Sequence, residues 1–247
     1  MKILLTNDDG ISSQGLSVLY DRLSVKHDVF VFCPDSNRSA ISHGINMYNP
    51  IAVNKISDNQ YTCSGTPVDC VFNAVRSVMK SQPDVVLSGI NKGANLGTDL
   101  IYSGTAAAAR QAALFGLPGI ALSIYKENVS DDYHFDAMAE FVTDNLDLLK
   151  SLANEEFFLN INALSLKSYK GVKYAGLSKR SYADGELIYT SPMKRMYSFF
   201  VGGQVSNEGG ENCDTAVSEK GYIALTRVYA QPSADDFEDF EKLKFKI

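Results

Sequence analysis

Short apolar runs alternate with longer amphipathic stretches over the first half of the chain. Residues 2–6, 28–34 and 83–89 read "KILLT", "DVFVFCP" and "PDVVLSG", which are typical of buried β-strands. Residues 13–24 and 67–80, which lie between such runs, carry apolar side chains at helical spacing. Strands that recur about every 30 residues, with a helix between them, predict parallel β-α-β units.

The alternation continues toward the C-terminus. We predict further strands at 51–56, 60–65, 118–124 and 157–164, and further helices at 104–116, ending at Gly116, and at 135–152. Residues 172–230 read mostly as strands and loops, with a polar glycine-rich stretch at 202–215, and residues 235–245 read as a short helix. The pattern predicts an α/β fold with a doubly wound, mainly parallel sheet and an irregular, β-rich C-terminal extension.

The length and composition favour a single domain. The chain has 247 residues and is 45% hydrophobic, which suits one large globular α/β domain. It contains no repeat and no low-complexity linker. We therefore predict one domain over residues 1–247, with the doubly wound core at 1–165 and the extension at 166–247.

The negative charge of the chain disfavours nucleic acid polymers and anionic membranes as partners. The formal net charge is -6 and the sequence pI is about 5.1, whereas binding to nucleic acid polymers or anionic membranes requires basic surfaces. The sequence shows no secretory signal, and no apolar run approaches the roughly 20 residues of a membrane-spanning helix. We therefore expect a cytoplasmic protein that binds small molecules or other proteins, with neither nucleic acid polymers nor membranes as partners.

The cysteines and histidines do not predict a metal site. The four cysteines form no C-x-x-C pair, so we interpret them as reduced thiols rather than as a disulfide framework or a zinc site. The three histidines are too scattered to suggest a histidine site. These seven residues are Cys33, Cys63, Cys70, Cys213, His27, His43 and His134.

Polar segments follow three of the predicted strands. They read "TNDDG" (6–10), "PDSNRS" (34–39) and "SGINKGAN" (88–95). The carboxyl ends of parallel strands converge on one crevice, so the oxygen-bearing side chains of these segments can meet there and bind Mg²⁺, Mn²⁺ or Ca²⁺. Asp-Asp-Gly is also a common turn and helix-start sequence, which stays an alternative. The candidate side chains are Asp8, Asp9, Asp35, Ser36, Asn37, Ser39, Asn91 and Asn95.

A second feature is the start of the Ala-rich helix. Ser103, Gly104 and Thr105 place backbone N–H groups and two hydroxyls at one helix N-terminus, which is a potential anion site. Plain helix capping by Ser103 or Thr105 is the alternative. With a hard cation at the same rim, a phosphate beside a metal is the more economical interpretation. The glycines of 89–97 then allow close approach to the ligand, or are simply flexible loop residues.

These residues resemble the SurE family of metal-dependent 5'/3'-nucleotidases. The similarity rests on "LLTNDDG", "PDSNRSAIS", "GTPVDCV" and "SGINKGANLGTDLIYSGTAAAA", and more weakly on "FFLNIN" and "GYIALT". These blocks follow one another in order from residue 4 to residue 226, so the resemblance is nearly full length.

The resemblance implies a Rossmann-like core and a site of defined residues. It implies one divalent metal ion per subunit, Mg²⁺ or Mn²⁺ with Ca²⁺ able to occupy the site, held by Asp8, Asp9, Ser39 and Asn91. It implies a phosphate subsite formed by Asn95 and the turn Ser103, Gly104 and Thr105. The implied substrates are nucleoside 5'- and 3'-monophosphates, with short polyphosphate in some members. It also implies homodimers or homotetramers in which the C-terminal part of one subunit embraces another.

The chain departs from the family pattern at a few positions. Ala40 stands where the family usually has Gly, and Gln111 and Ala112 stand where it usually has Glu-Gly. The pairs Asn162-Ala163 and Arg227-Val228 replace segments that usually contain proline. No implied ligand is lost, so we expect these changes to affect substrate preference, strand geometry and subunit packing rather than metal binding.

Several roles stay open. Asp9 is our candidate to orient or deprotonate the attacking water, although the sequence does not separate it from Asp8. A phospho-aspartate intermediate is disfavoured because both carboxylates are committed to the metal. His43 is either a general acid or a loop residue, Arg38 binds phosphate or forms a structural ion pair, and Tyr102 packs on a base or in the core. The extension's tyrosines favour an oligomer contact: Tyr182, Tyr189, Tyr197 and Tyr229.

Other functions explain the pattern less well. An oxidoreductase would need G-x-G-x-x-G after the first strand, and "NDDGISSQG" lacks it. A glycosyltransferase could use paired Asp and a metal, but would not account for the adjacent anion site. The alternative that remains is a nucleotide-binding or sensing protein with little turnover on the same scaffold, motivated by Gln111 and Ala112.

Overall fold

The computed structural model describes residues 1–128 and 130–233, and the helix predicted at 235–245 lies outside these ranges. The elements, in chain order, are β1 (Lys2–Thr6), α1 (Gln14–Leu23), β2 (Asp28–Pro34), β3 (Val53–Ser57), β4 (Gln60–Cys63), α2 (Pro67–Asn73), the π-helix η1 (Ala74–Val78), β5 (Val85–Lys92), the 3-10 helix η2 (Gly97–Ile101), α3 (Gly104–Leu114), β6 (Gly119–Tyr125), α4 (Phe135–Asp144), α5 (Leu146–Leu152), β7 (Phe157–Leu164), β8 (Val172–Tyr174), β9 (Lys179–Tyr182), β10 (Gly185–Thr190), β11 (Met196–Val201), β12 (Val205–Glu208), α6 (Asp214–Glu219) and β13 (Ile223–Tyr229).

The centre of the fold is a nine-stranded sheet with the order β3-β4-β2-β1-β5-β6-β7-β13-β8. The six neighbouring strands from β4 to β7 are parallel, because each β-α-β crossover returns the chain to the same end of the sheet. β3 pairs antiparallel with β4, and β13 pairs antiparallel with β7. The predicted doubly wound, mainly parallel α/β sheet is therefore confirmed.

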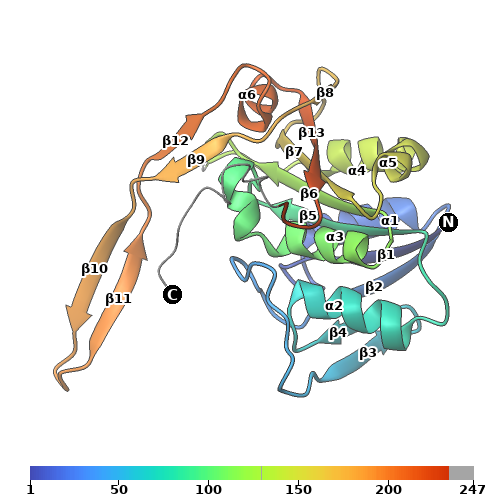
Figure 1. Ribbon diagram of the computed structural model, residues 1–247, viewed down its shortest axis with the longest axis horizontal. Helices are drawn as coiled ribbons and strands as arrows, with labels where there is room; N and C mark the ends of the chain where they lie inside the picture. The colour runs from blue at the N-terminus through green and yellow to red at the C-terminus, as the bar shows by residue number, and fades with distance from the viewer. Residues whose placement is uncertain (129, 234–247) are drawn as a thin grey trace, which may run out of the picture.

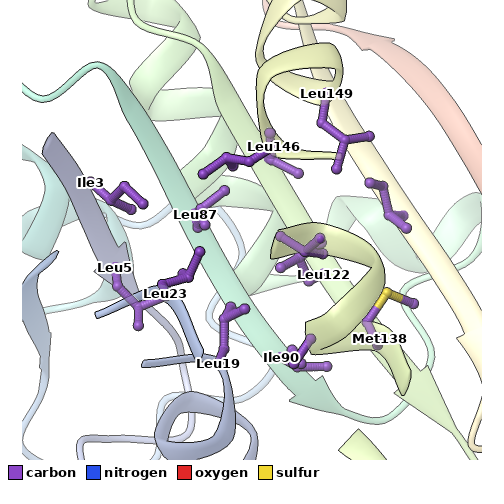
Figure 2. Close-up of a cluster of buried hydrophobic side chains, with 14 of the residues drawn as sticks. Ile3, Leu5, Leu19, Leu23, Leu87, Ile90, Leu122, Met138, Leu146 and Leu149 are labelled. Carbon is purple, nitrogen blue, oxygen red and sulfur yellow. The ribbon is translucent and has the colours of Figure 1, made fainter. Parts of the chain in front are cut away.

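Helices cover both faces of this sheet (Figure 1). The largest core cluster joins α1, α4 and α5 to one face, where Leu19, Met138 and Leu146 pack against Leu87 and other strand residues (Figure 2). A second cluster joins α2 and α3 to the opposite face, around Phe32 and Val86. Burial of both faces explains why the central strands read as continuous apolar runs.

Two predicted helices differ from the structure. The stretch predicted as one helix at 135–152 is two helices, α4 and α5, separated at Asn145. The Asn145 side chain donates to the carbonyl of Phe141 at 2.8 Å, and such local bonds compete with helix continuation. The helix predicted at 67–80 begins at Pro67, where Thr66 and Asp69 form a capping box, and it continues as a π-helix only to Val78.

The extension has more structure than its sequence indicates. Its last described strand, β13, lies inside the main sheet between β7 and β8, and α6 occupies part of the region predicted as strands and loops. β10 and β11 form a separate two-stranded ribbon, residues 185–201, which projects away from the body (Figure 1). The β-rich extension is confirmed, and the domain boundary at residue 165 stays a prediction. None of the described helices has the length and apolar character needed to span a bilayer.

Gly15 sets how closely α1 approaches the sheet. A Cβ atom at this position would lie 2.0 Å from the carbonyl oxygen of Ile90 and 2.9 Å from the Phe135 ring. We expect Gly15→Ala to lower the free energy of unfolding by about 1–3 kcal/mol, because α1 and β5 must separate. Ser17→Ala, at an exposed position of the same helix, is the control in urea unfolding. Equal stabilities of the two variants would contradict this packing.

Candidate active site

The sheet order places the predicted ligands at one point. β1 leads to β2 on one side, and β5, its neighbour on the other side, leads to β6, so the winding reverses between β1 and β5. Ligands of open α/β sheets bind beyond the carboxyl ends of the strands at such a switch point. Asp8 and Asp9 follow β1, and Asn91 lies near the end of β5.

A pocket of about 650 Å³ opens at this point. Five of the eight predicted site residues line it: Asp8, Ser39, Asn91, Asn95 and Ser103. The other lining residues are Ala40, Lys92, Ala94, Asp99, Tyr102, Tyr182, Asp184 and Phe200. Segments from four separate parts of the chain thus meet around one cavity, as the sequence predicts for the first three.

Asp8 is the most deeply buried acidic group of the pocket, with 4% of its surface exposed. Its Oδ1 accepts a hydrogen bond from the Thr105 hydroxyl at 2.6 Å. The pKa of Asp8 is raised from 3.8 to about 6, mainly by burial and also by the charge of Asp9, and the Thr105 hydrogen bonds offset part of this rise. The site therefore holds a carboxylate that lacks compensating positive charge.

Asp9 is half-buried and is connected to Ser39 through one residue. The Asn37 side chain donates to Asp9 Oδ1 at 3.2 Å, and its own Oδ1 accepts the backbone N–H of Ser39 at 2.9 Å. Burial raises the pKa of Asp9, while the backbone N–H and the positive charge of Lys92 lower it. Asn37 thus holds the loop after β2 against the loop after β1.

Asn91 is aimed by an irregularity in β5. The register with β6 shifts between Ser88 and Asn91, which inserts one extra residue into β5 at this point. Such bulges re-aim side chains next to functional sites. The Asn91 Nδ2 donates to the carbonyl of Gly93 at 3.0 Å, and within the described part of the chain its Oδ1 accepts no hydrogen bond. An amide oxygen is therefore available to the pocket.

The start of α3 combines helix capping with close approach to Asp8. The Ser103 hydroxyl accepts from the N–H of Ala106 at 3.0 Å, so the capping interpretation holds for this side chain. The Gly104 N–H has no hydrogen-bond partner among residues 1–128 and 130–233. A Cβ at Gly104 would lie 2.9 Å from the Asp8 Cβ, so only glycine permits this contact. The Thr105 hydroxyl, bonded to Asp8, supports the carboxylate rather than facing the pocket.

Asn95 is held by two buried asparagines of β7. Its backbone N–H donates to Asn162 Oδ1 at 2.9 Å, and its carbonyl accepts from Asn160 Nδ2 at 2.9 Å. Its side-chain Nδ2 donates to Ser123 Oγ at 2.7 Å. The sequence motif "FFLNIN" supplies both asparagines, and their function is to position the loop after β5 at the pocket.

Sequence reasoning missed several pocket residues. Lys92 follows Asn91 directly in the chain. Because Asn91 is predicted to meet Asp8 and Asp9 at one edge of the sheet, the positive charge next to it was a signal that could have identified Lys92. Tyr182, Asp184 and Phe200 come from the extension, more than 80 residues after Asn95 in the chain, and no local pattern indicates that they reach the pocket.

Other candidates lie outside the lining of the pocket. The Arg38 guanidinium bonds Asp35 Oδ1 at 3.2 Å and the carbonyl of Ser64 at 2.9 Å, which is the structural ion pair that the sequence left open. His43 bonds Gln111 at 3.1 Å and lines a different cavity. The departure at Gln111 thus lies away from the pocket lining.

Ala40, which stands where the family usually has Gly, adopts a backbone conformation that is typical of glycine. Ala40 lines the pocket with a φ of 58°, in the left-handed region that favours glycine. The backbone path that a glycine would allow is therefore kept with alanine. The loop that carries Ser39 retains its place at the pocket.

The donor set fits a hard divalent cation. Two carboxylates, a hydroxyl and an amide oxygen are the ligand types that Mg²⁺ and Mn²⁺ prefer. Burial raises the pKa of both carboxyl groups, so a cation beside them would stabilise their charged forms. Across the part of the chain that the structure describes, no group of three or more His, Cys, Asp or Glu residues offers another metal site.

The raised pKa of Asp8 predicts a pH-dependent stability of the metal-free protein. The folded protein holds this proton more tightly than the unfolded chain, so stability falls as pH rises from about 4 to about 6. In EDTA at pH 7, the free energy of unfolding of Asp8→Asn, measured in urea, should exceed that of wild type by up to about 3 kcal/mol. Below pH 4 the two proteins should have the same free energy of unfolding. Asp21→Asn, on the exposed face of α1, is the control, and a gain independent of pH would refute the argument.

Comparison with known proteins places this arrangement in a family. The family profile described as "Survival protein SurE" matches residues 3–184. The chain is 46% identical over 182 residues to "5'-nucleotidase SurE" of Treponema pallidum (strain Nichols), a match that covers 71% of this chain and 96% of the relative. It is 38% identical over 248 residues to "5'-nucleotidase SurE" of Desulfitobacterium hafniense (strain DSM 10664 / DCB-2), covering 99% of this chain and 95% of the relative.

A solved structure shows the same fold over the whole molecule. The crystal structure of the SurE protein from Aquifex aeolicus superposes with a TM-score of 0.81 at 29% identity, and the match covers 98% of each chain. The family profile covers the core and the first part of the extension, and the structural match covers both regions. This chain belongs to the SurE family.

Proposed function

We propose that this protein is a metal-dependent phosphatase that hydrolyses nucleoside 5'-monophosphates, and also 3'-monophosphates, to nucleoside and phosphate, with short polyphosphate as a further substrate. The observation that carries the proposal is the pair Asp8 and Asp9 at the switch point, beside the N-terminus of α3, where Ser103 lines the same pocket as Asp8. The nucleotidase activity is supported by relatives named "5'-nucleotidase SurE" at 38% and 46% identity.

The residues that would hold the metal are Asp8, Asp9, Ser39 and Asn91, with one divalent ion, Mg²⁺ or Mn²⁺, per subunit. When bound, such an ion supplies Lewis-acid polarisation of a phosphate oxygen and activation of water. Asp8 and Asp9 would provide the negative charge, and Ser39 and Asn91 would provide neutral oxygens.

The remaining residues bind phosphate and handle protons. The Gly104 N–H, the Ser103 hydroxyl and the Asn95 amide would donate to the phosphoryl oxygens as their charge develops. Thr105 would act through Asp8 rather than on the phosphate, because its hydroxyl donates to that carboxylate and lowers its pKa. Asp9 is our candidate to orient or deprotonate the attacking water, since it is less buried than Asp8 and is flanked by Lys92.

The test is phosphate release from a panel of 5'- and 3'-nucleoside monophosphates with Mg²⁺, Mn²⁺ or EDTA. We expect metal-dependent release by wild type and a loss of about 100-fold or more in kcat for Asp9→Asn, because the charge that binds metal and activates water is removed. Asp58→Asn, at an exposed carboxylate far from this pocket's lining, should retain full activity.

The same experiment separates the alternative function. Nucleotide binding without phosphate release under any metal would overturn the enzyme proposal and leave a nucleotide-binding or sensing protein. Equal activity of Asp9→Asn and wild type would show that the catalytic carboxylate is wrongly assigned.

We further propose that the protein forms homodimers or homotetramers through the ribbon at 185–201. An isolated two-stranded hairpin is at best marginally stable in water, and this one exposes many large apolar side chains. The cross-strand pairs Leu187 with Phe199 and Tyr189 with Tyr197 place four of them on one face. A second copy of the chain would cover this apolar face. Tyr182 instead bonds Asp99, and Tyr229 packs on Phe157.

The oligomer proposal is tested by sedimentation of two matched variants. Leu187→Asp introduces a charge on the apolar face and should weaken self-association by about 10-fold or more. Ile188→Asp introduces the same charge at the next residue, on the opposite face, and should leave the assembly intact. Identical behaviour of the two variants would contradict this interface. The cytoplasmic location stays a prediction.

A further inference from the structure

The pocket is lined by two chemically different kinds of side chain. Polar groups such as Asp8, Asn95 and Ser103 share the lining with three aromatic side chains: Tyr102, Tyr182 and Phe200. Tyr102 is 59% exposed and Phe200 is 89% exposed, although an apolar ring is more stable when covered. Single exposed apolar residues are common, but rings from two distant segments on one pocket indicate a ligand surface.

Tyr102 is presented to the pocket on a fixed backbone. Its carbonyl accepts the N–H of Ser42 at 2.9 Å, and its own N–H donates to the carbonyl of Asp99 at 2.9 Å. The Ser42 hydroxyl also donates to the neighbouring carbonyl of Ile101 at 2.6 Å. These bonds hold the backbone on both sides of the ring, so a ligand stacked on Tyr102 costs little additional ordering. Tyr102 directly precedes Ser103, so the ring lies next to the proposed phosphate subsite.

The part of the lining that comes from the extension is also held in place. The Tyr182 hydroxyl donates to Asp99 Oδ1 at 2.5 Å, and the Arg180 guanidinium pairs with Asp99 Oδ2 at 2.9 Å. Phe200 lies near the body end of the ribbon, where it pairs with Glu186. Phe200 shares its face of the ribbon with Glu186 and Ile188, not with Leu187 and Phe199. It is therefore on the face opposite the proposed oligomer contact.

We propose that Tyr102 and Phe200 form the base subsite of this enzyme, in which the base of a nucleoside monophosphate stacks on the Tyr102 ring while its phosphate lies at Ser103. The subsite rests on the nucleotidase function proposed above. Aromatic rings offer a face on which every base can stack, so Tyr102 and Phe200 select nucleotides over other phosphate esters without selecting one base. Tyr182, fixed by Asp99, is a positioning residue of the same wall.

The test compares a nucleoside 5'-monophosphate with ribose 5-phosphate, which keeps the sugar and phosphate and lacks only the base. For wild type we expect a higher kcat/KM for the nucleotide. In Tyr102→Ala and in Phe200→Ala the ratio of the two kcat/KM values should fall by about 10-fold or more, mainly through KM, because base stacking is lost. Tyr102→Phe keeps the ring and should keep the ratio. Tyr48→Ala, at a fully exposed tyrosine outside this pocket's lining, is the control.

Equilibrium binding decides the inference independently of turnover. Calorimetry in EDTA should show that Tyr102→Ala weakens binding of the nucleotide and leaves binding of ribose 5-phosphate unchanged. A ratio that is the same in wild type and both alanine variants, with normal thermal midpoints, would overturn the base subsite while leaving the nucleotidase intact. Absence of hydrolysis of both substrates by wild type would overturn the proposed function, and the binding ratio would still decide the subsite.

Discussion

Two adjacent carboxyl groups at the end of a buried strand repel each other, and one of them, Asp8, is almost completely removed from water. Such a group raises the free energy of the folded protein unless donors or a cation surround it. The pocket is arranged around this requirement. Thr105 donates to Asp8 from the start of α3, and Lys92 places positive charge beside Asp9.

The position of α3 is constrained by close contacts with Asp8, with β6 and with α2. Gly104 lies so close to the Asp8 side chain that a methyl group would not fit, and a Cβ atom at Gly119 of β6 would lie 2.0 Å from the carbonyl oxygen of Ala109 in the same helix. The helix is therefore held close to Asp8 at its first residue and close to β6 at its middle. Because its other face packs with α2, the anion-binding N-terminus cannot shift without disturbing the core.

The extension completes the pocket through one buried acidic residue. Asp214, at the start of α6, accepts the N–H of Gly97 at 2.7 Å and the N–H of Ser178 at 2.9 Å. These bonds join η2, which carries Asp99, to the strand β9 that carries Tyr182. The aromatic side chains that the extension brings to the pocket thus depend on contacts between residues 36 and 117 positions apart in the chain. A buried carboxylate that accepts several backbone N–H groups is a rigid connection.

Much of this molecule is determined by local sequence. The apolar runs fix the order and type of the core elements, and the paired carboxylates, the SurE-like blocks and the helix start at Ser103 identify the candidate metal and phosphate residues. These signals are local because each depends on the spacing of a few neighbouring side chains.

Tertiary structure decided the remainder. Only packing shows that the bulge in β5 aims Asn91, that the Thr105 hydroxyl is used by Asp8, that Asn160 and Asn162 hold Asn95, and that Phe200 reaches the pocket. The break at Asn145 is set by a side-chain bond that helical periodicity does not report. These features arise from contacts between distant segments, and a linear pattern of hydrophobic and polar residues carries no information about which distant residues will meet.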